Sequence, residues 1–138
     1  MAQVDNTTVA VTAPVSLTTA ESQVAQFTVG GNPPSVGVRT TPWALIEVAI
    51  PNVTGLATTA SVTVNIRSGT TSAGTLLGSA TATNGAAGAG AVGGVSAMAL
   101  IPTGTDGAVF VGALTSSSTG TMAASATAPI IVTALLLD

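Results

Sequence analysis

The sequence contains no histidine, cysteine, lysine or tyrosine. Those residue types supply most of the general bases, nucleophiles and soft metal ligands of proteins. Their absence excludes disulfides, thiolate metal sites and the ordinary base that would activate a serine hydroxyl. We therefore expect that the protein is not an enzyme and that it needs no cofactor and no metal ion.

Charge is almost as scarce as reactive side chains. Charged residues make up 5% of the 138 residues, against about 25% in an average soluble domain. The only cations are Arg39 and Arg67, and five acids give a net charge of −3. Two cations cannot neutralise a track of phosphates, so we expect no nucleic-acid binding. The mean hydropathy of +0.68 predicts a surface that other subunits partly cover, with a free domain coated by Thr and Ser hydroxyls as the alternative.

Aromatic residues are nearly absent as well. Hydrophobic residues make up 46% of the chain, but the aromatic ones are only Phe27, Trp43 and Phe110. A core built from Val, Ile, Leu and Ala suits thin layers, which favours a β-sandwich, and the length predicts one domain over residues 1–138. Residues 86–101 form an uncharged run that Pro102 closes. A bilayer span needs about 20 such residues, so we expect no membrane segment.

Alternating side chains and turn residues predict about eight short strands. The clearest is residues 60–67 (ASVTVNIR), in which apolar and polar residues alternate. The turn-rich residues 68–74 follow, and residues 75–83 form the return strand of a hairpin. Gly and Pro mark further boundaries, and the Ala/Gly stretch 84–94 is either a mobile loop or a strand approached closely by another backbone. The remaining predicted strands are residues 7–18 (broken by Pro14), 23–29, 41–50, 95–101, 108–114 and 121–137 (interrupted at Pro129).

The strand over residues 41–50 (TPWALIEVAI) is apolar on both faces, which predicts a central strand with both faces covered. Glu47 is the one acid inside such a strand. It is either a tuned general base or, as we prefer, one half of an ion pair with Arg67 or Arg39, because a buried charge needs a partner. Trp43 is either an anchor of a partner interface, a filler of the core or a platform for a sugar.

Residues 43–77 carry a recognisable pattern. A Trp-led strand, WALIEVAIPNV, precedes ASVTVNIRSGTTSAGTLL, in which Ile-Arg-Ser-Gly-Thr-Thr is followed by Gly-Thr-Leu. This segment resembles the structural proteins of tailed phages and related viruses that have small jelly-roll or tumour-necrosis-factor-like folds. The resemblance implies an antiparallel jelly-roll sandwich, a homotrimer, and a place in the virion as a capsid decoration (cement) protein, a head fibre or a tail-associated module.

The resemblance also implies partners. We expect a decoration protein on the capsid surface that contacts copies of itself and the major capsid protein. Residues 1–11 would extend as an assembly arm that adds a strand to a neighbouring sheet. The interface candidates are therefore Val4, Val9, Val11 and Trp43. The alternatives are a fibre or adhesin module that binds host glycans, and a subunit of a self-assembling filament or surface layer.

Overall fold

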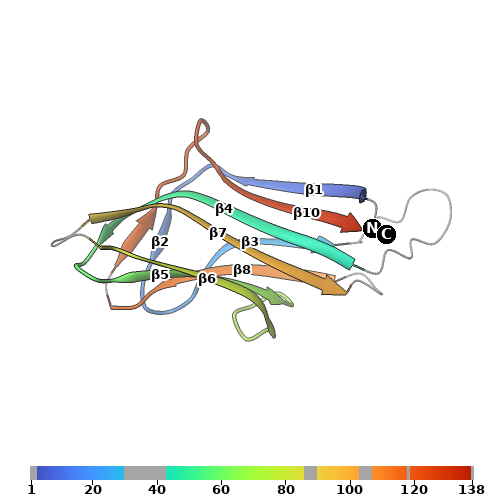
Figure 1. Ribbon diagram of the computed structural model, residues 1–138, viewed down its shortest axis with the longest axis horizontal. Coiled ribbons are helices and arrows are strands. Elements are labelled where there is room, and N and C mark those ends of the chain that lie inside the picture. The colour runs from blue at the N-terminus through green and yellow to red at the C-terminus, as the bar shows by residue number, and fades with distance from the viewer. Residues whose placement is uncertain (1–2, 30–42, 86–89, 103–106, 118, 138) are drawn as a thin grey trace.

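The protein is built entirely from β-strands over the part of the chain that the structure describes. The computed structural model describes residues 3–29, 43–85, 90–102, 107–117 and 119–137 (Figure 1). These residues contain ten strands and no helix. The strands are β1 (Gln3–Val11), β2 (Val15–Leu17), β3 (Ser22–Val29), β4 (Trp43–Leu56), β5 (Ser61–Ser68), β6 (Leu76–Thr83), β7 (Gly90–Pro102), β8 (Gly107–Thr115), β9 (Gly120–Met122) and β10 (Ile130–Leu137).

Each strand of the first half of the chain pairs antiparallel with its counterpart in the second half. β1 pairs with β10, β2 with β9, β3 with β8, β4 with β7, and β5 with β6. The chain thus forms one long hairpin with its tip at the turn between β5 and β6, and this hairpin is rolled into two stacked sheets (Figure 1). Such nesting is the jelly-roll arrangement, so the fold class predicted from the sequence is confirmed.

The two sheets differ in their strand order. Sheet A has the order β1-β10-β4-β9-β2, and β7 lies on the other edge of β4. Sheet B has the order β3-β8-β5-β6. β6 also packs against β7 at the border between the sheets. Gly78 permits this approach, because a side chain at that position would overlap the carbonyl oxygen of Met98.

The alternation in β5 explains why this segment forms a strand. Val62, Val64 and Ile66 are fully buried between the sheets, whereas Thr63 and Arg67 lie on the other side of the strand. The β5–β6 hairpin forms as predicted, and the Ser68 backbone N–H donates to the Thr75 carbonyl oxygen at 2.9 Å to close its turn.

The hydrophobic core consists of aliphatic side chains, with no aromatic residue among the largest buried ones. Burying a side chain of this size contributes about 1.5–3 kcal/mol, so many small contributions replace a few large ones. Phe110 is 4% exposed but does not belong to this core cluster. The largest fully buried side chains are Leu17, Ile46, Ile50, Leu56, Ile66, Met122, Ile130, Val48, Val53, Val62 and Val64.

β4 lies at the centre of sheet A, as its composition predicted, but only one of its faces is covered. Ile46, Val48 and Ile50 point into the core, whereas Glu47 and Ala49 are exposed. The prediction that both faces are covered is therefore wrong for the single chain. The physical reason is that sheet B covers only one side of sheet A, and no third layer of described residues lies over the other.

The amino-terminal segment pairs within its own chain. Of residues 1–11, the structure describes residues 3–11, which form β1 along the edge of sheet A. Its residues pair with β10 in a continuous register from Asp5 to Val11, and the register shifts between Gln3 and Asp5. The exchange of this segment with a neighbouring subunit stays a prediction. β1 has its second edge unpaired among the described residues, and an edge of this kind is where another strand can add.

The structure also shows where several of the predicted strands begin and end. The Ala/Gly stretch 84–94 enters β7 at Gly90, and residues 86–89 of it lie outside the described residues. β4 continues past Pro51, where the predicted strand ended, to Leu56. Within the described ranges there is no helix with the length and apolar character to cross a membrane.

Candidate interaction surface

The side of sheet A that faces away from the core carries an apolar surface. In β4 the odd-numbered residues Leu45, Glu47 and Ala49 alternate with the buried Ile46 and Val48. The register of β10 and β7 places side chains of the same orientation beside each of them. We call the resulting surface the outer face. It consists of three rows across β10, β4 and β7: Leu135, Leu45 and Leu100; Thr133, Glu47 and Met98; Ile131, Ala49 and Ser96.

The outer face exposes two large apolar side chains, and the third of the described surface, Leu76, lies on β6 in sheet B. Met98 is 59% exposed and Leu100 is 51% exposed. From the spacing of strands and of same-side residues, the three rows cover roughly 300 Å² of sheet plane. Six of the nine positions are apolar, so the apolar part is roughly 200 Å², close to the size of the larger apolar patches of monomers, which are often functional. It is suited to be the centre of an interface with a polar rim around it.

The outer face carries a single charge. Glu47 is exposed between Thr133 and Met98, and it makes no ion pair with any residue that the structure describes. The predicted pair between Glu47 and Arg67 is wrong, because Arg67 lies on β5 in the opposite sheet. Arg39, the other predicted partner, lies outside the described residues.

Arg67 instead pairs with Glu21, just before β3. Its Nε donates to Glu21 Oε2 at 2.8 Å and its Nη2 donates to Glu21 Oε1 at 3.2 Å. Asn65 Nδ2 also donates to Glu21 Oε1, and Ser79 Oγ donates to Asn65 Oδ1 at 2.9 Å. Arg67 Nη1 donates to the Gly74 carbonyl oxygen at 3.1 Å. We call Glu21, Asn65, Arg67 and Ser79 the Glu21 cluster.

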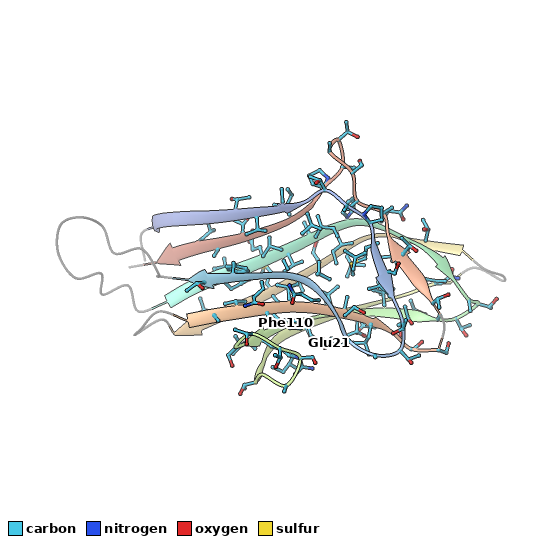
Figure 2. All side chains as sticks on the ribbon, turned by 180° about the vertical axis from the view of Figure 1, so that it is seen from behind. Glu21 and Phe110 are labelled. Atoms are coloured by element: carbon cyan, nitrogen blue, oxygen red, sulfur yellow. The ribbon has the colours of Figure 1, made fainter. Side chains whose placement is uncertain are left out.

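The Glu21 cluster lies on the outside of sheet B and packs over Phe110 and Gly112. Phe110 on β8 and Glu21 in the connection between β2 and β3 lie close together (Figure 2). A Cβ at Gly112 would come within 2.7 Å of both the Glu21 Cγ and the Phe110 Cε1. Gly112 therefore leaves the space in which Glu21 crosses β8 to reach Arg67. Through Arg67, the cluster links the start of β3 and the β5–β6 turn to sheet B. Its role is therefore structural.

Val9 and Val11, two of the predicted interface residues, lie against the core and not on a free surface. Val9 and Val11 are partly buried and pack against the hydrophobic core from β1, so they do not form a free contact surface. Thr8 and Ala10, which alternate with them, are exposed instead. The backbones of Val4 and Trp43 lie in β1 and β4, and their side chains are outside the described part of the structure.

No clear signal in the sequence pointed to Met98, Leu100 or Glu21. In β7 the buried Ala97 and Ala99 are small and the exposed Met98 and Leu100 are large, so hydrophobicity does not reveal which side is buried. Glu21 is separated from Arg67 by 46 positions in the sequence. A glycine inside the apolar segment 108–114 was the one local sign that another group crosses the strand there.

Side chains that could bind a metal ion are not gathered in the described regions. No group of three or more acidic, His or Cys side chains there is placed to hold a metal ion. Comparison with known protein families finds no family model that matches the chain. A search of curated proteins also finds no match. The resemblance to viral structural proteins therefore rests on the sequence pattern of residues 43–77, and the fold rests on the strand order.

Proposed function

We propose that the protein is a non-enzymatic structural component of a virion. It acts as a decoration protein on the capsid surface and stabilises the lattice through contacts with copies of itself and with the major capsid protein. The observation that carries this proposal is the outer face of sheet A, where Met98 and Leu100 are more than half exposed. The sequence resemblance over residues 43–77 supports the assignment to a virion.

Burial of the outer face supplies the binding energy in this account. At about 25 cal/mol per Å², covering the apolar part of the outer face, roughly 200 Å², contributes on the order of 5 kcal/mol before the cost of association is subtracted. Contacts at the rim, including the free edge of β1, add to this central patch. Since only Glu47 is charged on the outer face, salt screening has little effect on most of the contact.

The scarcity of charge is consistent with a subunit that folds on its own and then joins a larger assembly. Arg67 and Glu21 neutralise one another within the chain and so offer little to a partner. The exposed residues of the β5–β6 hairpin are mostly hydroxyl-bearing or small. The hairpin therefore offers little apolar area to a partner, and the outer face is the part of the described surface best suited to bind one.

The proposal is tested by looking for the protein in particles. Virus particles from the source of the sequence are purified on a density gradient and analysed by quantitative mass spectrometry. We expect this chain to co-purify in a fixed, small-integer ratio to the major capsid protein. Particles from which the chain has been stripped should rupture at a lower temperature and should regain stability when the purified protein is added back. Recovery of the chain only from the unassembled soluble fraction would contradict the proposal.

A further inference from the structure

Glu47 lies in the middle row of the outer face and has apolar or hydroxyl-bearing neighbours on every side. Thr133 of β10 and Met98 of β7 are its cross-strand partners. Leu45 and Ala49 are its nearest neighbours of the same orientation along β4. None of these groups carries a positive charge. A partner that covers the outer face must therefore also cover a carboxylate that has no cation beside it among the described residues.

A covered carboxylate without a cation opposes binding. Leaving such a charge unpaired weakens an association by on the order of 100- to 1,000-fold. A second copy of the outer face cannot supply the cation, because it would bring only another Glu47. Arg67 is held by Glu21 on the opposite sheet. The remaining cation of the sequence is Arg39, which lies outside the described residues.

We propose that the outer face docks onto a different protein, whose contact surface is apolar and presents one Lys or Arg side chain to Glu47. This inference rests on the proposed function, in which that partner is the protein of the capsid lattice, and it assigns the outer face to that partner and not to self-association. Net charge favours the same choice. At −3, two copies of the chain repel each other, whereas a basic site attracts them.

The first test uses simple probes of the surface chemistry and does not need particles. Decylammonium, decyl glucoside and decyl sulfate have equal alkyl chains and differ in charge. Each is titrated below its micelle concentration into protein labelled at the methionine methyl groups, and the shift of the Met98 resonance is followed by NMR. We expect decylammonium to bind about fivefold more tightly than decyl glucoside, as for one exposed ion pair. Decyl sulfate should bind most weakly.

Charge variants test whether Glu47 causes the preference for decylammonium over decyl glucoside. Glu47→Gln should remove the difference between decylammonium and decyl glucoside. Thr83→Lys changes the net charge by the same single unit from an exposed position on β6 of sheet B, and it should keep that difference. A Glu47→Gln protein that still prefers decylammonium as strongly as the wild type would overturn the inference.

The second test uses stripped particles and separates the inference from the proposed function. Glu47→Gln should weaken rebinding to the particles about 10-fold, and Glu47→Lys should weaken it further because two cations then face one another. If both variants rebind like the wild type while Leu100→Asp does not, the proposed function stands and the basic partner is wrong. If the wild-type protein itself does not bind particles, the proposed function fails and the amphiphile titration still decides the inference.

Sedimentation equilibrium tests whether a second copy of the chain binds the outer face. The inference predicts that any self-association of the wild-type protein is unchanged in Leu100→Asp. Self-association that is lost both in Leu100→Asp and in Arg39→Gln would mean that the outer face binds another copy through Arg39, and it would overturn the inference.

Discussion

Leu100→Asp is expected to weaken the binding of the protein to stripped particles by about 100-fold. The substitution removes an apolar side chain of the outer face, worth about 1.5–3 kcal/mol on burial, and puts a second carboxylate near Glu47. Either effect alone would lower the affinity, and together they reach roughly 3 kcal/mol, which is the 100-fold loss. Rebinding is measured as occupancy against free protein concentration.

Leu76→Asp is the matched control for this variant. Leu76 is 49% exposed and Leu100 is 51% exposed, but Leu76 lies on β6 in sheet B. The two substitutions therefore change the same residue type at the same exposure on opposite faces of the sandwich. We expect Leu76→Asp to bind within about twofold of the wild type and both variants to unfold within about 0.5 kcal/mol of it. Equal losses for both would show that the outer face has no special role.

Glu21→Ala is expected to lower the free energy of unfolding by roughly 3 kcal/mol. The carboxylate accepts hydrogen bonds from Arg67 and Asn65, and its side chain is only 9% exposed. Its removal leaves a guanidinium and an amide without their anion. We place the loss at the lower end for a broken buried pair, because the Arg67 side chain keeps 21% exposure. The measurement is urea denaturation at neutral pH.

A double-mutant cycle separates this pair from general damage. Arg67→Ala alone should cost nearly as much as Glu21→Ala, and the double variant should cost about 2 kcal/mol less than the sum of the two. Glu47→Ala is the control, since it also removes an acid but one that is exposed and unpaired among the described residues; it should cost less than about 0.5 kcal/mol. Additive losses in the cycle would refute the stabilising role of the Glu21 cluster.

Much of the fold could be predicted because the strands are local patterns. The alternation of Val62, Val64 and Ile66 and the turn after Ser68 define β5 and its hairpin without any knowledge of the remaining chain. Pro14 and Pro129 separate strands for a local reason as well, because proline cannot donate to a ladder. The sandwich class therefore follows from the sequence. The described residues contain ten strands where about eight were predicted, and β2 and β9, with three residues each, are too short to show a pattern of their own.

The partners of the charged residues could not be predicted in the same way. Glu47 lies in an apolar strand and was expected to be buried, but the strand is apolar on both sides and the sequence does not say which side the second sheet covers. Glu21 lies in a connection with no pattern of its own. Only the rolling of the hairpin brings it across β8 to Arg67. Long-range pairing of this kind depends on the whole topology.

The outer face could not be predicted from the sequence, because the sizes of the side chains in β7 are distributed in an unusual way. Ordinarily the larger apolar residues of a strand face the core, but β7 places Ala97 and Ala99 inside and Met98 and Leu100 outside. The small interior residues fit the place where β6 comes close to β7, as Gly78 also indicates. The large residues are then left on the surface, which is the arrangement that we attribute to assembly.

Oxidation of the methionines tests the burial of the outer face most directly. Met98 is 59% exposed in the single chain, whereas Met122 is fully buried and provides an internal control. Dilute hydrogen peroxide converts exposed methionine to the sulfoxide, and mass spectrometry gives the rate at each site. We predict that Met98 oxidises rapidly in the free protein and at least about tenfold more slowly on particles, with Met122 slow in both. Equal oxidation rates of Met98 in the free and the particle-bound protein would contradict the account.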